Sequence, residues 1–160
     1  MKIVNICLVP ELELPVARLC FSEWREECVD AGIGSVSSYV EHMKDSFVFV
    51  ADSCLLGTVT VERRDMRRPE TPWLSSLLVL PGARGRGVGS ALVSFVMARF
   101  DELYLWAHDD VLGFYTRLGF TVLERCTYLG AEVSVCHWQS PVPSFPSSHC
   151  LSRQLWYPLL

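Results

Sequence analysis

The residues best suited to chemistry in this chain lie between Leu77 and Ser90. An apolar run that predicts a buried strand ends at Pro81, and a loop rich in glycine and arginine follows before a predicted helix. The first N–H groups of such a helix have no partner within it, and the helix dipole adds partial positive charge there. This combination predicts a site for a phosphate or a pyrophosphate.

Glycine and arginine have different tasks in such a loop. Gly85, Gly87 and Gly89 let the backbone approach a bulky anion, because they lack a side chain. Arg84 and Arg86 can add charge-assisted hydrogen bonds, although both can equally be solvated surface residues. The predicted anion-binding residues are Arg84, Gly85, Arg86, Gly87, Val88, Gly89 and Ser90.

Two other phosphate-binding loops fit this segment less well. A P-loop needs Gly-Lys followed by Ser or Thr, and no such sequence follows the glycines. A Rossmann dinucleotide loop is approximated by Gly85, Gly87 and Ser90, with Asp109 about 20 residues further on. However, four residues separate the strand from Gly85, and the third glycine is absent. The Rossmann interpretation stays open as a minor alternative.

Length and composition predict one globular domain, because 160 residues of which half are hydrophobic can bury a substantial core. The net charge of −4 argues against a general nucleic-acid binder, and the arginines at 63–68 are interpreted as a solvated loop. No apolar stretch approaches the ~20 residues that span a membrane, and the N-terminus is unlike a secretory signal. We expect a cytoplasmic protein.

The seven cysteines are scattered without any Cys-x-x-Cys pair, so we expect reduced and mostly buried thiols. The pairs Cys136-His137 and His149-Cys150 do not have the spacing of known zinc sites, and we predict no metal. No cysteine has an activating neighbour in the sequence, which disfavours a cysteine nucleophile.

Hydrophobic periodicity predicts a mixed α/β sheet with helices on both faces. The predicted strands are 2–9, 46–51, 54–62, 73–80, 103–107, 120–126 and 132–138. The predicted helices are 12–24, a second one capped by Ser35 or Ser37 and ending at Met43, 88–100, and a last one capped by Asp109 or Asp110 and ending at Leu118. Gly119 is the predicted stop of the last helix.

The predicted domain covers residues 1–138, and 139–160 form a C-terminal extension. Prolines and serines crowd the stretch 140–148, a composition typical of a linker. Residues 151–160 are too apolar for a free tail, so we expect them to dock on the domain or to pair two copies as a homodimer.

Two segments resemble one family. The pattern R-x-x-G-x-G at 84–89, after a strand that ends V-x-P at 79–81, is similar to the pyrophosphate-binding signature of the GCN5-related N-acetyltransferase (GNAT) superfamily. The segment 114–120 (FYTRLGF) is similar to the family's F-Y-x-x-x-G-F segment, one strand after the loop helix. The order of elements over 1–138 also matches that of the family.

The resemblance implies a mostly antiparallel sheet of about six to seven strands. It implies that acetyl-CoA donates its acetyl group to a primary amine, by direct transfer in a ternary complex. The segments 71–74 (TPWL) and 124–130 (ERCTYLG) further resemble a bacterial-type subgroup. The acceptor is expected to be an amine on a small molecule, a peptide N-terminus or a lysine.

The resemblance also implies roles for individual residues. The strand around Leu77, Leu78 and Val79 is expected to splay from its neighbour, so that its free backbone groups bind the pantetheine arm and the acetyl oxygen. The same residues can also be ordinary core. Tyr115 matches the family tyrosine that points at the coenzyme sulfur, which implies that it protonates the departing thiolate.

The base that deprotonates the amine is the open point, because no carboxylate lies in 73–80, where some family members carry a glutamate. His108 is the predicted base, since it ends a strand beside the expected cleft and imidazole takes up protons near neutral pH. The alternatives are Glu62, Asp65, Glu23 and water relayed through Ser75 or Ser76.

The first helix and the loop after it form the acceptor wall in this fold. The resemblance therefore implies that Trp24, Glu23, Glu26 and Tyr39 shape the acceptor pocket, although core packing or solvation explains them as well. Two rival functions remain: a non-catalytic sensor of acyl-CoA, and an interaction module on the same fold.

Overall fold

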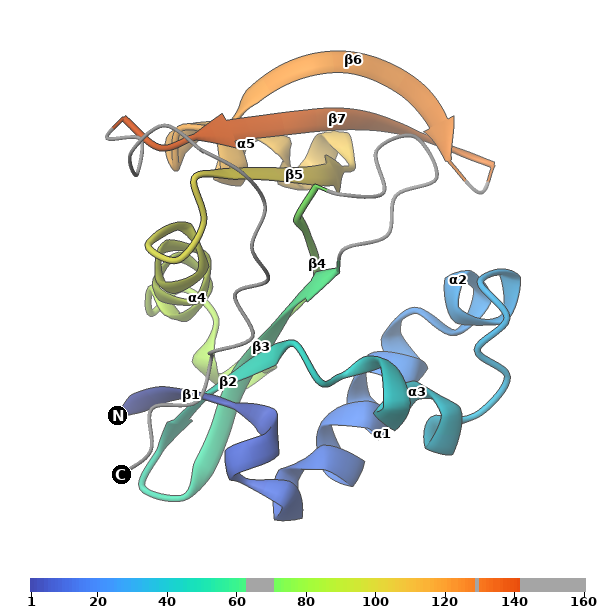
Figure 1. The fold of residues 1–160 in the computed structure, drawn as a ribbon, viewed down its shortest axis with the longest axis vertical. Helices are drawn as coiled ribbons and strands as arrows, with labels where there is room; N and C mark the ends of the chain where they lie inside the picture. The colour runs from blue at the N-terminus through green and yellow to red at the C-terminus, as the bar shows by residue number, and fades with distance from the viewer. Residues whose placement is uncertain (63–70, 129, 142–160) are drawn as a thin grey trace, which may run out of the picture.

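A computed structural model describes residues 1–62, 71–128 and 130–141 of the chain. Their strands form one seven-stranded sheet in the order β1-β2-β3-β4-β5-β7-β6 (Figure 1). The strands are β1 (Lys2–Asn5), β2 (Ser46–Ala51), β3 (Cys54–Glu62), β4 (Trp73–Val79), β5 (Glu102–Ala107), β6 (Thr121–Tyr128) and β7 (Ala131–Gln139). The predicted mixed α/β sheet is confirmed.

Helices and short turns connect the strands. The helices are α1 (Glu13–Glu23), α2 (Arg25–Asp30), α3 (Val36–His42), α4 (Val88–Met97) and α5 (Asp109–Arg117), and the 3-10 turns are η1 (Ile6–Leu8), η2 (Pro10–Leu12) and η3 (Pro81–Ala83). The predicted cap of α3 is confirmed, since the Ser35 hydroxyl accepts the Ser38 N–H at 3.1 Å. Gly119 follows α5 with a φ of +95°, as predicted for a helix stop.

Two local predictions were wrong, and one short helix was not predicted. The first strand ends at Asn5 rather than at residue 9, because the Asn5 side chain accepts the Cys7 N–H at 2.8 Å and turns the chain into η1. The cap of α5 is His108, while Asp109 and Asp110 occupy the first turn near the positive end of the helix dipole. Helix α2 was not predicted, because its six residues carry no apolar periodicity.

Some predictions fall outside the described residues. These are the arginine-rich loop at 63–68 with the base candidate Asp65, the pair His149-Cys150, and the extension from residue 142 onward. Within the described part of the chain, no helix has the length and apolar character needed to cross a membrane.

Two hydrophobic cores lie on opposite faces of the sheet. Phe47 packs on the core that α4 and α5 cover, and Val48 belongs to the core that α1 and α3 cover. Consecutive residues of a strand point to opposite faces, so β2 contributes to both layers. Leu92 of α4 and Val16 of α1 are fully buried in their respective cores. The expected helices on both faces are therefore present.

The sheet opens between β4 and β5. These two strands pair parallel, through Trp73 and Tyr104 alone among the described residues, whereas every other neighbouring pair is antiparallel. Beyond Trp73, β4 keeps only β3 as its partner up to Val79, and Figure 1 shows β4 (green) running obliquely away from β5. The splay follows the expectation. The Rossmann interpretation is wrong, because that fold requires a parallel sheet.

Candidate functional site

The loop between β4 and α4 forms a concave surface of backbone amides. Gly85 and Gly87 have φ angles of +71° and +78°, in the left-handed region that other residues rarely adopt. A Cβ atom on either glycine would meet nothing within 4 Å, so conformation rather than crowding requires glycine here. Left-handed residues in such a turn direct successive N–H groups toward one side, where they can bind an anion. We call residues 84–90 the anion loop.

The start of α4 completes the anion loop. Gly87 is the N-cap of this helix, whose first backbone hydrogen bond runs from the Ala91 N–H to the Gly87 carbonyl at 2.9 Å. The amides of Val88, Gly89 and Ser90 come before it and have no acceptor within the helix. The Val88 side chain is buried in the core, which holds these free amides in place.

Close packing joins the anion loop to the segment 114–120. A Cβ atom on Gly89 would lie 3.4 Å from both the Phe114 ring and the Val79 side chain. Helix α4 therefore begins against the end of β4 and against α5 at once. The two segments that resemble the same family signature are in contact in the structure.

The two arginines behave differently. The Arg84 side chain donates its Nε–H to the Val79 carbonyl at 3.0 Å, so it fastens the anion loop to the end of β4. Sequence reasoning did not find this contact, because a turn of undetermined shape lies between the two residues. The Arg86 side chain is exposed and makes no hydrogen bond or ion pair within the described residues.

The edge of β4 that faces the opening carries backbone groups that have no partner strand, and of these the Val79 carbonyl accepts from Arg84. The Leu80 N–H donates to the Leu56 carbonyl of β3 at 3.0 Å, so Leu80 turns its backbone groups toward β3. Successive residues of a strand turn these groups to opposite sides, and Val79 therefore faces the opening. Leu77 lies two residues earlier on the same edge, whereas Leu78 contributes a buried side chain to the core under α1 and α3.

A β-bulge interrupts β4 just before this edge. The register shifts between Thr58 and Thr60, so that Val59 of β3 opposes two residues of β4, Ser76 and Leu77. Ser76 has a φ of +47°, the left-handed conformation, which costs a residue other than glycine about 1–2 kcal/mol. Strain of this kind persists only where surrounding contacts hold it.

Tyr39 of α3 makes that contact. Its side chain is only 6% exposed, and its hydroxyl donates a hydrogen bond to the Ser76 Oγ atom at 3.1 Å. Burial raises the pKa of Tyr39 well above its ordinary value, and the nearby Cys20 thiol of α1 raises it further. Burial also raises the pKa of Cys20 to about 12. Tyr39, expected in the acceptor wall, thus links the helical layer to β4.

Tyr115 lies in the core beneath α5. Its side chain is 8% exposed and makes edge contacts with Phe114 and Phe120, at ring distances of 5.0 and 5.8 Å. Burial, and to a lesser extent the nearby Cys136 thiol, raise the pKa of Tyr115 to about 12. The hydroxyl is therefore protonated at neutral pH and able to donate.

Two of the alternative base residues meet at the start of the opening. The Ser75 hydroxyl donates to the Glu62 Oε1 atom at 2.9 Å, and the Glu62 side chain is exposed. Glu62 is the register partner of Trp73, and Ser75 is that of Thr60, so Glu62 and Ser75 share the face that α1–α3 cover. Sequence reasoning named Glu62 and Ser75 separately. Only the pairing of β3 with β4 brings them together.

The other base candidates stand apart. His108 follows β5 at the open end of the splay and is exposed, and its ring makes no hydrogen bond or ion pair with the described part of the chain. Glu23 and Glu26 are also exposed, at the end of α1 and the start of α2. Trp24, between those helices, is half-buried against the core of α1 and α3.

A row of aromatic rings that sequence reasoning missed crosses the same face. Trp73 packs on Trp106 at a centroid distance of 4.5 Å, and Trp106 stacks on Tyr128 at 4.3 Å. Tyr104 lies beside this row and contacts His137 at 4.6 Å. The spacing of the aromatic residues at 104 and 106 indicates that both lie on one face of β5. The row as a whole was not predictable, because the rings that they contact come from three other strands.

Cys136, His137 and Asp109, which were considered for a zinc site or a Rossmann dinucleotide site, have other contacts in the structure. Cys136 is fully buried on the α5 side, whereas His137 points to the opposite face and lies 3.4 Å from Glu102 Oε2, so these neighbours cannot share one ion. Asp109 forms an ion pair with Arg125 at 3.2 Å. In the described ranges, no three His, Cys, Asp or Glu side chains gather as a metal site.

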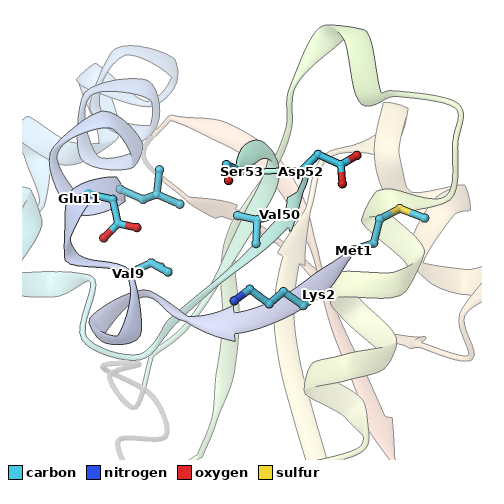
Figure 2. A pocket seen from close by; sticks show the side chains of 8 residues that line it. Met1, Lys2, Val9, Glu11, Val50, Asp52 and Ser53 are labelled. Carbon is cyan, nitrogen blue, oxygen red and sulfur yellow. The ribbon is translucent and has the colours of Figure 1, made fainter.

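A separate pocket lies at the β1 edge, away from the anion loop. Figure 2 shows its lining by the chain start, η2 and the β2–β3 turn. The lining residues are Met1, Lys2, Val9, Glu11, Leu12, Val50, Asp52 and Ser53. None of them is a predicted site residue, and one basic and two acidic side chains indicate no single charge of ligand.

Comparison with known proteins places this geometry in a family. Residues 44–122 match the model of the acetyltransferase (GNAT) domain. A search of curated proteins found no match. Among solved structures, the chain is similar to an aminoglycoside 6′-N-acetyltransferase complexed with coenzyme A, with 17% identity, a TM-score of 0.70, and coverage of 90% of this chain and 100% of that chain.

Two further structures have the same fold. One is an aminoglycoside 6′-acetyltransferase type Ii, with 20% identity, a TM-score of 0.69, and coverage of 89% of this chain and 100% of that one. The other is an N-acetyltransferase from Staphylococcus aureus Mu50, with 11% identity, a TM-score of 0.71, and coverage of 86% and 100%. At these identities the likeness concerns the fold. The family model, the fold, the splayed strand and the anion loop together lead to one conclusion: the chain belongs to the GNAT superfamily.

Proposed function

We propose that this protein is an acetyl-CoA-dependent N-acetyltransferase that acetylates a primary amine by direct transfer in a ternary complex. The observation that carries this proposal is the continuity of two features. An anion loop of free amides lies at one end of β4, and the edge of β4 that leads from it is unpaired. A diphosphate with an extended arm fits that sequence of features.

The donor groups present suit acetyl-CoA. The amides of 85–90, with Arg84 and Arg86, bind the pyrophosphate, because free N–H groups and guanidinium groups are strong donors to phosphate oxygens. The space beside Gly85 and Gly87 is open to receive it. The backbone groups of Leu77 and the Val79 N–H bind the pantetheine arm as a neighbouring strand would, while the Val79 carbonyl accepts from Arg84. Leu78 supports this edge from the core.

When bound, acetyl-CoA would supply a thioester as the acetyl donor. In the reaction the amine nitrogen forms the new C–N bond and the C–S bond breaks. The ammonium form of the amine (R–NH₃⁺) and acetyl-CoA thus give the amide, the CoA thiol and one proton. The chain must therefore remove one proton from the ammonium, whose pKa near 10.4 leaves it non-nucleophilic at neutral pH. It must also deliver one proton to the sulfur. Free amides of β4 polarise the carbonyl as negative charge develops on its oxygen.

Tyr115 is the proposed acid. Its side chain is largely buried, and its hydroxyl is protonated at neutral pH because burial raises its pKa to about 12. It gives its proton to the sulfur and regains one from the nitrogen, so it ends the cycle unchanged. Positioned proton donors of this kind contribute roughly 10²–10⁴-fold to rate.

Two groups are proposed as acceptors of the first proton. His108 stands at the open end of the splay with a free imidazole. Glu62 stands at the start of the opening with one carboxylate oxygen held by Ser75 and the other without a partner in the described structure. Water relayed through Ser75 can connect Glu62 to an amine. Glu23, exposed at the end of α1, adds negative charge that favours a cationic acceptor.

The test couples binding to turnover. Calorimetry with CoA and acetyl-CoA measures affinity, and thiol release with a panel of small amines, peptides and lysine measures transfer. Binding in the micromolar range together with amine-dependent thiol release is expected. Binding without any amine-dependent release favours a non-catalytic acyl-CoA sensor. No heat with millimolar CoA contradicts both.

A further inference from the structure

We infer that Tyr39 is a positioning residue, which holds the bulge of β4 in the shape that presents a free backbone amide to the acetyl group. This inference rests on the proposed acetyl transfer and adds to it. No part of Tyr39 is proposed to touch the substrate or the coenzyme. Its effect passes through Ser76.

The first observation is the strained residue itself. Three residues other than glycine have a positive φ among those described, and two of them, Asp52 and Ser53, form the tight turn between β2 and β3. Ser76 is the third, and it lies inside a strand, where no turn requires such a backbone. A left-handed serine within a strand must be held by its neighbours.

The second observation is the position of the bulge. Val59 opposes both Ser76 and Leu77, so one of these two β4 residues has no place in the ladder with β3. On the other side of β4 the pairing with β5 has already ended at Trp73. Backbone groups at the bulge therefore face neither β3 nor β5. These backbone groups lie on the free edge of β4, on the side of Val79 that is away from the anion loop. The acetyl end of an extended coenzyme whose diphosphate is bound at the anion loop would reach this position.

The third observation is the tether. The Tyr39 hydroxyl donates to Ser76 Oγ at 3.1 Å, and the Tyr39 ring is buried in the core of α1 and α3. Cys20 of α1 lies in the same buried core as Tyr39, so the ring that carries the tether is held by two helices. The hydrogen bond spans 37 positions in the chain. A buried tyrosine hydroxyl that bonds a half-buried serine so far away in the sequence indicates that the position of Ser76 is held by the helical layer.

These observations give Tyr39 one task. Loss of its hydroxyl leaves Ser76 free to relax from the left-handed region, which turns the backbone groups at the bulge away from their present direction. The thioester carbonyl then loses a donor, while the anion loop, formed by other residues, still binds the diphosphate. Removing one preorganised donor to a developing oxyanion costs roughly 10²–10³-fold in turnover, and partial misplacement costs less.

The experiment compares four proteins: wild type, Tyr39→Phe, Ser76→Gly, and the double variant. Tyr39→Phe is expected to lower kcat about tenfold, with KM for acetyl-CoA and the calorimetric Kd for CoA within about twofold of wild type. The double variant is expected to recover to within about threefold of wild type, because glycine adopts the left-handed conformation without a tether. Tyr104→Phe is the matched control, since it removes the hydroxyl of another buried tyrosine, which donates a hydrogen bond to Glu102.

The outcomes separate two failures. A Tyr39→Phe variant that turns over like wild type overturns the inference, and so does a double variant as slow as Tyr39→Phe. If wild type shows no amine-dependent turnover, the proposed function fails. The inference is then decided by the ratio of Kd values for CoA and acetyl-CoA: a preference for acetyl-CoA that Tyr39→Phe removes and the double variant restores supports it. An unchanged ratio overturns it.

Discussion

The anion loop and the face around the start of the splay are built in contrasting ways. Every group of the anion loop comes from seven consecutive residues, 84–90, and its shape depends on the φ angles of Gly85 and Gly87. The face around the splay joins Tyr39 of α3 to Ser76 of β4 and Glu62 of β3 to Ser75 of β4, and both pairs meet only after the sheet has formed. The first is a local backbone site and the second a tertiary side-chain site.

The difference separates binding from chemistry. Every substitution except one to proline keeps the backbone amide, but the direction of these amides depends on glycine, so loop variants should act on affinity for the coenzyme. Side chains around the splay and Tyr115 should act on turnover at saturating coenzyme. A loop variant that lowers only turnover, or a splay variant that lowers only affinity for the coenzyme, would contradict this distinction.

Tyr115→Phe should have the largest effect on turnover. The change removes the proposed acid while leaving the ring in its aromatic contacts. We expect kcat to fall about a hundredfold, with the Kd of acetyl-CoA little changed. Thiol release at saturating acetyl-CoA measures it. Turnover within about twofold of wild type would show that Tyr115 is an ordinary core residue.

Glu62→Gln and His108→Ala should distinguish the two proposed proton acceptors. Glutamine keeps the contact with Ser75 but cannot take a proton, so a catalytic Glu62 predicts a fall of roughly 10²-fold in kcat. A catalytic His108 predicts the same for His108→Ala. Ser75→Ala should reproduce part of the Glu62 effect only if Ser75 orients that carboxylate. Two silent variants would contradict both assignments.

Gly87→Val should weaken CoA binding about tenfold or more, because a β-branched residue does not adopt the left-handed conformation of the N-cap. The matched control is Gly82→Ala, which lies in the same connection, has no positive φ and has nothing within 4 Å of a new Cβ. Calorimetry with CoA is the measurement. Equal affinities of the two variants would mean that the anion loop does not hold the coenzyme.

Alkaline pH should produce the smallest effect, and it falls on the tertiary region. The Cys20 thiol ionises near 9.0 when unfolded but near pH 12 in the fold, so the folded state keeps a proton that the unfolded state loses. Its contribution to stability is present below about pH 9 and is lost as the pH rises toward 12. Thermal unfolding across that range should show a steeper decline for wild type than for Cys20→Ala. Parallel declines would contradict this account.

Much of the fold was predictable because its signals are local. Alternating or continuous apolar residues predicted the strands, and Ser35 and Gly119 marked helix ends through hydrogen bonds and backbone angles within a few residues. Prediction failed where the decisive contact was unexpected, as at Asn5, whose side chain ends β1 early. It also failed for α2, which lacks periodicity because it packs mainly through Cys28.

By itself, the sequence determined the anion loop, since a strand end, glycines with positive φ and a helix start are neighbours along the chain and need no distant partner. Which side chains surround the splay depends instead on how the sheet and the helices assemble. The meeting of Glu62 with Ser75 depends on strand register, and that of Tyr39 with Ser76 on the packing of a helix over a bulge. Register and packing arise from the burial of the whole sheet, so no short stretch of sequence contains them.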